Sequence, residues 1–288
     1  MKKLLSILFL LTLFTQGYAQ EEQKQEKVSN EFGTFYIGWG YNRSYFTKSD
    51  LQIIGRGYDL TFHGIKATDN PSNFRWDVYF NPKFFTVPQF NIRAGFYFKD
   101  KYSVSVGYDH MKYITSNEQN VSISGYVDPS VNHFQLSGTY DHTPYYFDNT
   151  AFHYENSDGL NYFRFQFERT DQWYKTKNKG WFAINTQYGI GSGFLLTFND
   201  LNWAYTHSRK RVSISGWGMS VTSGVRLDFF NHFYIQGNVM VGFNHLTKVR
   251  TRHGSDDYAR QFYGFLEHDI MIGTIWYFKK KKKKAKSA

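Results

Sequence analysis

Gly264–Phe278 reads GFLEHDIMIGTIWYF, a stretch in which side chains of two kinds alternate. From Leu266 onward, one set of alternate positions holds Leu, His, Ile, Ile, Thr, Trp and Phe, so it is mainly apolar and ends in aromatic residues. The interleaved set holds Glu, Asp, Met, Gly, Ile and Tyr. Successive side chains of a β-strand point to opposite faces, so this stretch predicts a strand with lipid on one face and a polar lumen on the other.

The composition of the whole chain agrees with this prediction. Its 288 residues are enough for one large domain or two small ones, and 20% of them are aromatic. The mean hydropathy is nevertheless only −0.55. A high aromatic content together with a low mean hydropathy is not expected of a soluble domain. It is expected of a barrel whose apolar residues occur singly at alternate positions. The absence of cysteine excludes disulfides, thiolate zinc sites and cysteine nucleophiles.

The formal net charge of +10 is concentrated in short segments of the chain. Seven lysines at 279–284 and 286, together with Lys2 and Lys3, account for nine of the ten charges. About one positive charge remains for the rest of the chain. The sequence therefore offers no basic domain surface of the kind that nucleic acid requires, and we expect no nucleic-acid partner.

Segments at the two ends differ in composition from the body of the chain. Residues 1–19 combine two lysines, an apolar run and small residues at Gly17 and Ala19, as in a signal peptide cleaved after Ala19. The polar segment 20–31 is predicted to be a disordered periplasmic lead-in. Residues 32–278 are predicted to form the barrel, and 279–288 a flexible polybasic tail that could meet anionic headgroups.

Alternating segments separated by turn residues continue along the body of the chain, and no apolar run is long enough for a transmembrane helix. Ten strands are predicted: Phe32–Phe46, Leu51–Lys66, Asn73–Asn81, Gln89–Phe98, Tyr102–Thr115, Leu160–Trp173, Trp181–Leu196, Val212–Phe229, His232–Asn244 and Gly264–Phe278. The long polar segment Ser116–Gly159 contains a predicted hairpin, Val121–Val127 with His133–Tyr140. Twelve strands result if this hairpin joins the wall.

The closing stretch resembles the terminal strand of Gram-negative outer-membrane β-barrels, which typically ends in an aromatic residue such as Phe278. The resemblance covers Phe32–Phe278 and depends on the alternating pattern, not on a family motif. It implies an all-β antiparallel barrel in the cell outer membrane, with lipid and lipopolysaccharide as surroundings and the barrel-assembly machinery as a partner. Short turns after even-numbered strands place both ends of the barrel region in the periplasm.

The same alternation assigns a set of charged residues of both signs to the lumen. The predicted lumen residues are Asp59, His63, Arg75, Asp77, Arg93, Asp109, Arg164, Glu168, Arg226, Asp228, Glu267 and Asp269. In a small barrel, side chains nearly fill the interior, so the first hypothesis is an ion-paired polar plug. The alternative is a narrow charged pathway for a small solute.

Two clusters, Asp109-His110 and Glu267-His268-Asp269, raise the hypothesis of a surface hydrolase acting on peptide or lipid A. Their architecture and residue types are similar to those of omptin-type surface proteases, although no omptin motif matches. Adjacent residues of one strand point apart, so each histidine is a poor partner for its own neighbours. A lipid A deacylase would need an outward serine beside the histidine, and the alternation places none there.

Two predicted loops are basic, and lipopolysaccharide phosphates are the anions that arginine would bind there. Their candidate anion-binding residues are Arg209, Lys210, Arg211, Lys248, Arg250 and Arg252, and the alternative is ordinary solvated charge. No histidine pair has the spacing of a metal site, so no metal or cofactor is predicted. The sequence favours an integral outer-membrane protein with a filled lumen and a structural or interaction role over an enzyme. It leaves the ligand, the conductance and the oligomeric state open.

Overall fold

The computed structural model describes residues 32–70, 75–79, 81, 89–131, 136–147, 152–177, 181–203 and 206–278. Nearly all of these residues belong to one antiparallel sheet that closes on itself as a barrel. Among the described residues, no helix is long and apolar enough to cross a membrane. The predicted signal peptide, lead-in and lysine tail lie outside the described residues.

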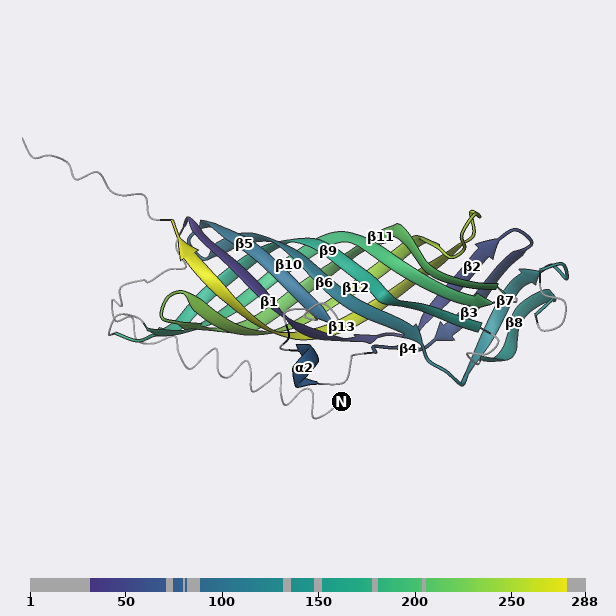
Figure 1. The fold of residues 1–288 in the computed structure, drawn as a ribbon, viewed down its shortest axis with the longest axis horizontal. Helices are drawn as coiled ribbons and strands as arrows, with labels where there is room; N and C mark the ends of the chain where they lie inside the picture. The colour runs from purple at the N-terminus through teal and green to yellow at the C-terminus, as the bar shows by residue number, and fades with distance from the viewer. Residues whose placement is uncertain are drawn as a thin grey trace, which may run out of the picture.

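Eight strands pair in sequence to form the closed ring (Figure 1). They are β1 (Thr34–Phe46), β5 (Phe90–Lys99), β6 (Tyr102–Thr115), β9 (Phe152–Lys175), β10 (Phe182–Trp203), β11 (Thr206–Phe229), β12 (Phe233–Arg250) and β13 (Tyr258–Tyr277). The stretch Gly264–Phe278 lies in β13 and closes the ring, since Phe265 to Tyr277 pair with β1. Short connections, such as Asp100–Lys101 between β5 and β6, lie at one end of the ring, which we call the turn end.

The wall continues beyond the ring at the opposite end, through a part that we call the extension. It is formed by β2 (Ser49–Gly55), β3 (Tyr58–Ile65), β7 (Gln119–Val127) and β8 (Gly138–Phe147), which pair in that order, with β2 also pairing to the outer part of β13. The two-residue strand β4 (Ala67–Thr68) pairs with the end of β6. In the chain, β2 follows β1 and β7 follows β6 after only short breaks. These strands of the extension therefore continue the ring strands β1 and β6.

The all-β antiparallel barrel is confirmed. Its strand number depends on where the wall is counted: the closed ring has eight strands, and the continuous sheet path has twelve, as in the twelve-strand alternative. The predicted strand Leu51–Lys66 is instead the hairpin β2–β3, in which Gly57 adopts a left-handed backbone conformation at the turn.

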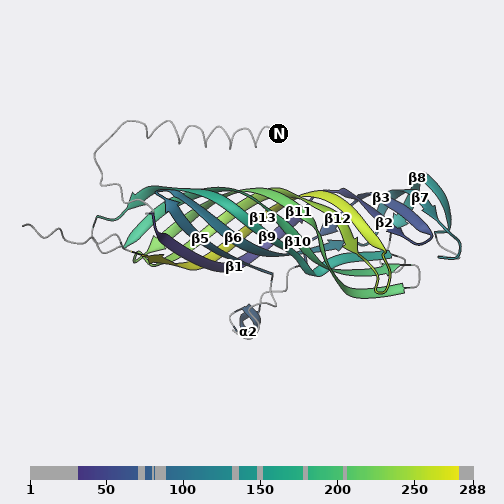
Figure 2. The ribbon, with the colours of Figure 1, turned by 90° about the horizontal axis from the view of Figure 1, so that it is seen from above.

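One predicted strand is wrong. Within Asn73–Asn81, the described residues contain the short helix α2 (Trp76–Tyr79) in place of a strand. Figure 2 shows α2 outside the barrel wall, below β1. It is held there by Tyr79, whose ring packs 4.7 Å from the ring of Tyr41 and whose carbonyl accepts the Tyr41 hydroxyl. Alternation of polar and apolar residues also occurs in this segment, which explains the wrong prediction.

The barrel has two different interiors. Within the extension and the adjoining ends of the ring strands the interior is apolar, and its core includes Leu60, Phe62, Phe152 and Trp203, all almost completely buried. Toward the turn end the interior is polar, with buried arginines, carboxylates and amides. Tyr234 lies there across Gly38 and Gly273, where an added Cβ would overlap its ring. Glycine thus provides space for an inward aromatic side chain.

Candidate functional site

The polar interior is organised around a buried ion-pair network contributed by three neighbouring strands. Arg164 on β9 places its Nε 2.7 Å from Oδ2 of Asp109 on β6. Arg93 on β5 lies between Asp109 and Glu168, with nitrogen to oxygen distances of 3.7 Å and 3.8 Å. Glu168 also accepts hydrogen bonds from the hydroxyls of Tyr36 and Ser103. Since all of these side chains are buried, each charge depends on its partners for compensation.

Two further groups complete the network. Nearer the turn end, Arg226 donates to Asp228 at 2.8 Å and to the Tyr97 hydroxyl at 3.0 Å. The two carboxylates of β13 are held by amides: Asn42 donates to Glu267 at 3.0 Å, and Asn238 donates to Asp269 at 2.7 Å. The contact of Arg226 with Tyr97 crosses the lumen between β11 and β5, whereas the two amide contacts join neighbouring strands.

The structure places eight of the twelve predicted lumen residues in this interior: Arg93, Asp109, Arg164, Glu168, Arg226, Asp228, Glu267 and Asp269. The other four predictions are wrong. Asp59 and His63 lie on the outward face of β3, because in the extension the apolar positions face inward and the polar positions face solvent. Arg75 and Asp77 belong to α2, where they pair with each other and are 66% and 62% exposed.

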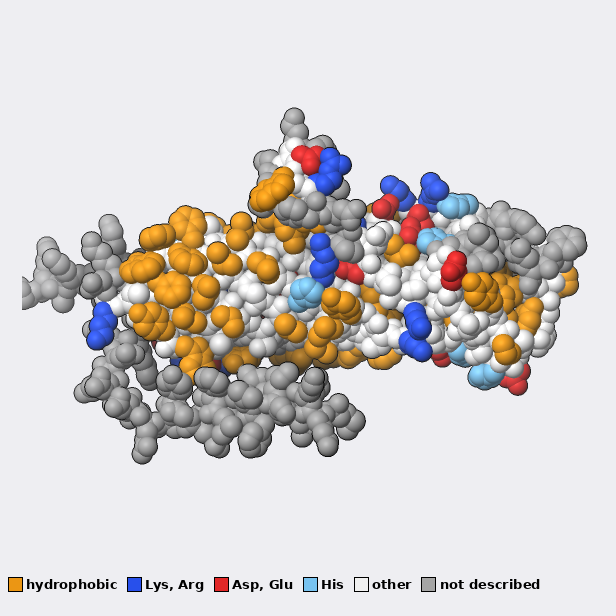
Figure 3. Space-filling model, turned by 90° about the horizontal axis from the view of Figure 1, so that it is seen from below, with side chains coloured by type: hydrophobic (Ala, Val, Ile, Leu, Met, Phe, Trp, Pro, Cys, Tyr) orange, Lys and Arg blue, Asp and Glu red, His pale blue; other side chains and the backbone are white. Residues whose placement is uncertain are grey.

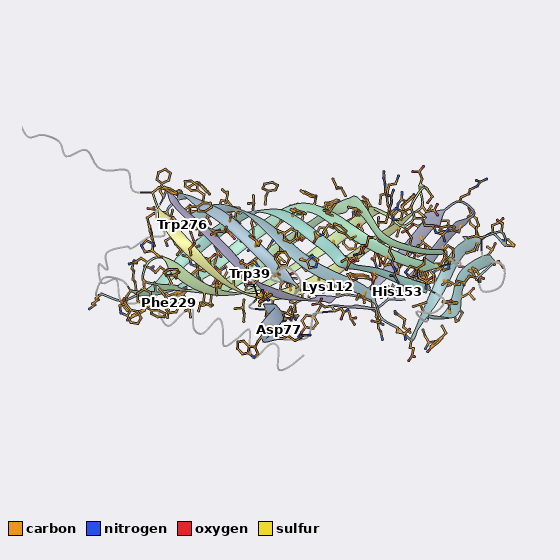
Figure 4. The ribbon with its side chains drawn as sticks, viewed as in Figure 1. Trp39, Asp77, Lys112, His153, Phe229 and Trp276 are labelled. Atoms are coloured by element: carbon orange, nitrogen blue, oxygen red, sulfur yellow. The ribbon has the colours of Figure 1, made fainter. Side chains whose placement is uncertain are left out.

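Figure 4 shows where several labelled side chains lie along the barrel. Trp276 and Phe229 lie near the turn end, whereas His153 lies toward the extension. Asp77 projects with α2 away from the barrel wall.

The histidines of the two predicted hydrolytic clusters do not share a cleft with their neighbouring carboxylates. Asp109 and Asp269 are buried in the lumen, whereas His268 is exposed on the outward face and His110 is buried against the ring of Phe90. His110 is hydrogen-bonded to Asn161 at 2.8 Å, and His268 stacks on Tyr45 with ring centroids 5.9 Å apart. The hypothesis of a hydrolase at these two clusters therefore loses its geometric basis.

The six predicted anion-binding residues differ in their exposure and in their partners. Arg252 is engaged within the fold, 3.7 Å from Asp257 and over the rings of Tyr58 and Trp203. Lys210 is exposed and pairs with Asp158, and Arg209 contacts His207, while Arg211 is half-buried. Lys248 and Arg250 are exposed on β12.

Lys248 has a cationic neighbour, Arg260, at the other end of the same predicted basic loop. Lys248 and Arg260 lie over the same ring, that of Tyr258, at 5.4 Å and 5.1 Å. Tyr258 is also the register partner of Arg250. We call Lys248, Arg250 and Arg260 the basic cluster. The charge of the loop predicts these three cations, but not that they gather around Tyr258 across strands β12 and β13.

A second outward group was also missed. His63 on β3 contacts both Asp50 on β2 and Ser124 on β7, each at 3.0 Å. The three residues come from three strands, and no local sequence spacing indicates that they meet. Among the described residues, no group of three or more His, Asp or Glu side chains could hold a metal ion.

The outer surface changes character along the barrel axis. Figure 3 shows hydrophobic side chains covering the half of the ring away from the extension, while the opposite half is mostly polar. Exposed residues of this apolar surface include Val106, Phe165, Ile190, Trp217, Val221, Val239, Ile270, Ile272 and Trp276. An apolar outer surface around a polar filled interior defines a barrel of the membrane-spanning type.

Comparison with known proteins gives likenesses of fold only. No family model and no curated protein sequence matches this chain. The structure is similar to the attachment invasion locus protein Ail of Yersinia pestis in complex with the heparin analogue sucrose octasulfate (11% identity, TM-score 0.32, 85% of this chain and 99% of that chain). It is also similar to the outer membrane protein AlkL (8%, 0.38, 91% and 99%) and to OprG of Pseudomonas aeruginosa (10%, 0.39, 86% and 98%). At these TM-scores the likenesses carry no argument about function.

Proposed function

We propose that this chain is an integral protein of a Gram-negative outer membrane, with a sealed barrel that holds the extension outside the cell. The location is supported by the outward side chains of β13, where Leu266, Ile270, Ile272 and Trp276 are all exposed. A transmembrane barrel needs such an apolar band, roughly 25 Å tall, with aromatic residues at its edges. The short connections then lie in the periplasm and the extension lies outside the cell.

The observation that carries the proposed function is the closed lumen. Arg93, Asp109, Arg164, Glu168 and Glu267 all lie at the level of the apolar band or next to it, and each is at most 3% exposed. Farther out, the apolar core of the extension fills the interior. An open channel would leave lumen side chains in contact with water. The structure therefore supports an anchoring and interaction role over a conducting one.

Conductance measurements test the sealed barrel. Full-length protein inserted into planar lipid bilayers should give no stepwise current, because the ion-paired side chains occupy the lumen. Arg164→Ala is the matched variant, because it removes one of the two arginine side chains in this part of the lumen and should produce small, irregular currents. Regular current steps from the unmodified protein, reduced by Arg93→Gln, would favour the alternative of a narrow solute channel.

A second candidate role, binding of lipid phosphates, is favoured by the basic cluster. Lys248, Arg250 and Arg260 lie beyond Phe262, an exposed aromatic residue at the outer part of β13. Phosphate groups of lipopolysaccharide would lie near such an edge, and arginine can bind a phosphate with two parallel hydrogen bonds. The same surface could also carry solvated charge alone.

The lipid role predicts a difference between phosphorylated and dephosphorylated lipid A. Binding of bis-phosphorylated lipid A to barrels in nanodiscs should weaken at least tenfold in Arg250→Gln/Arg260→Gln. The matched control is Lys101→Gln/Arg169→Gln, which removes two cations that pair with Asp171 near the turn end. Equal binding of both lipids by the unmodified protein and by both double variants would contradict the lipid role. The basic cluster would then be solvated charge alone.

The remaining expectations on processing belong to the same proposal. We infer that residues 1–19 are removed as a signal peptide, that the barrel-assembly machinery inserts the chain, and that 279–288 remains as a periplasmic tail. Mass spectrometry of protein purified from outer membranes would identify the mature N-terminus.

A further inference from the structure

Three side chains on the outward face of the extension form one hydrogen-bonded chain. Nδ1 of His63 lies 3.0 Å from Oδ2 of Asp50, and Nε2 of the same ring lies 3.0 Å from Oγ of Ser124. The backbone amide of Gly64 donates to the other carboxylate oxygen of Asp50 at 2.9 Å. The imidazole thus connects a carboxylate on one nitrogen with a hydroxyl on the other.

Irregularities in the sheet bring these three residues together. Asp50 lies at a register shift between β2 and β3, which separates the pairs made by Ser49 and Leu51. Ser124 lies at a second shift, between β7 and β8. In each shift the extra residue is on the facing strand, at His63–Gly64 in β3 and at Asp141–His142 in β8, so Asp50 and Ser124 keep their outward positions. Bulges occur often beside active sites.

The surroundings suit an acid-base role for His63. Its side chain is 25% exposed, so the ring is open to solvent but packed against the ring of His142 at 4.8 Å. Burial would raise the pKa of Asp50, but the hydrogen bonds from His63 and from the Gly64 amide outweigh it and lower that pKa. Asp50 is therefore the ionised group that holds a proton on Nδ1 and leaves Nε2 as the acceptor for the serine hydroxyl.

A backbone amide also contacts the serine. The N–H of His142 donates to Oγ of Ser124 at 3.0 Å, which fixes the position of the hydroxyl oxygen. His142 itself adopts a left-handed backbone conformation, with a φ of 46°. The register shift between β7 and β8 includes this residue, opposite Ser124.

We propose that Asp50, His63 and Ser124 form a catalytic triad that hydrolyses carboxylic esters outside the cell. His63 Nε2 takes the hydroxyl proton while Oγ of Ser124 attacks the carbonyl carbon. The tetrahedral intermediate then collapses, the bond to the alcohol oxygen breaks, and His63 gives its proton to that oxygen. Water next attacks the acyl-serine through the same base, releasing the carboxylic acid and restoring Ser124. The carboxylate of Asp50 orients the ring and stabilises the imidazolium.

The neighbours of the triad indicate the class of ester. Gln52, Thr61 and Asp59 share this outward face with the exposed ring of Tyr126, so the surroundings of the site are mostly polar. Short acyl groups, such as acetyl esters on polar molecules, fit such an open site. This inference does not depend on whether the barrel conducts.

The test uses the folded full-length barrel in detergent, with 4-nitrophenyl acetate as the probe ester and a fluorophosphonate as the serine label. We expect ester hydrolysis and a single phosphonylated residue, Ser124. Ser124→Ala should abolish both, and His63→Gln and Asp50→Asn should each lower the hydrolysis rate at least tenfold. The matched control is Ser122→Ala, which removes a serine two residues away on the same face of β7 and should keep the activity.

Heat-modifiable migration on gels shows that each variant has folded, so a loss of activity is not confused with a loss of the barrel. Unchanged hydrolysis in Ser124→Ala, or no label on Ser124 in the folded protein, would overturn the assignment. The three residues would then be a surface hydrogen-bond network that only connects β2, β3 and β7.

Discussion

Individual buried charges in the lumen depend on specific partners, and the pair of Arg164 and Asp109 shows this most clearly. Both side chains are completely buried and only 2.7 Å separate their charged atoms. Removing one partner of such a pair leaves an uncompensated charge, which costs about 3–5 kcal/mol, whereas replacing both with apolar residues is often neutral.

We therefore expect Arg164→Leu to lower the free energy of unfolding by about 3–5 kcal/mol. The double variant Arg164→Leu/Asp109→Leu should recover most of this loss, because no unpaired carboxylate remains. Urea unfolding in phospholipid vesicles measures both values. A single variant as stable as the unmodified protein would mean that Arg93, 3.7 Å from Asp109, compensates the carboxylate without Arg164.

Glycine 38 provides a second test of packing at single positions. A Cβ added there would overlap the Tyr234 hydroxyl oxygen, and its three nearest atoms all belong to the side chains of Tyr234 and Met271. Gly38→Ala should destabilise the barrel by roughly 1–3 kcal/mol, as overpacking typically does. The same substitution in a Tyr234→Ala background should cost much less, since the overlapping ring is gone. Equal costs in both backgrounds, again from urea unfolding, would contradict this packing.

At the level of strands, the alternation of side chains is preserved along the whole barrel, but its relation to the interior reverses. In β13 the apolar positions face outward and the carboxylates face the lumen. In β3 the apolar positions Leu60 and Phe62 face inward, while Asp59 and His63 face out. The sequence of β3 alone shows the same period of two, so it could not reveal that this strand lies outside lipid, where water replaces the hydrocarbon.

This reversal predicts opposite sensitivities for two phenylalanines. Phe62→Ala, in the core of the extension, should cost about 3–5 kcal/mol, because it leaves a cavity in a packed apolar interior. Phe165→Ala, on the outer face of the ring and 67% exposed, leaves no internal cavity and should cost distinctly less. Unfolding and proteolysis, each measured on both variants, give the loss of stability that each substitution causes. Equal costs would argue against two differently solvated sections.

The contacts of Asp50 also predict how stability responds to acid. The pKa of Asp50 is lowered in the folded state. The contribution of its charged carboxylate to the free energy of unfolding is therefore complete above the ordinary carboxyl pKa of about 3.9 and is lost as the pH falls below it. The melting temperature of the unmodified protein should therefore fall more steeply below about pH 4 than that of Asp50→Asn. Thermal melts of both proteins across this range provide the comparison. Parallel curves would show that the His63 contact does not stabilise the charged carboxylate.

For the molecule as a whole, the sequence predicted the barrel, the closing strand and most of the lumen charges, because lipid on one side imposes alternation on every membrane-spanning strand. It did not predict α2, since a helix of four residues leaves too little periodicity to detect. It also missed the triad of Asp50, His63 and Ser124 and the pairing of Lys248 with Arg260 around Tyr258. These groups arise from strand register and bulges, which bring distant residues together without a local motif.

Thiol labelling tests the central claim, a sealed barrel that displays its extension, most directly. The chain has no cysteine of its own, so single cysteines report on single positions. In intact cells treated with a small membrane-impermeant thiol reagent, Asp59→Cys should be labelled fully. Gln166→Cys, which replaces a side chain buried in the polar lumen, should remain unlabelled until the barrel is unfolded. Rapid labelling of Gln166→Cys in the folded protein would contradict a sealed lumen, and an unlabelled Asp59→Cys would contradict a displayed extension.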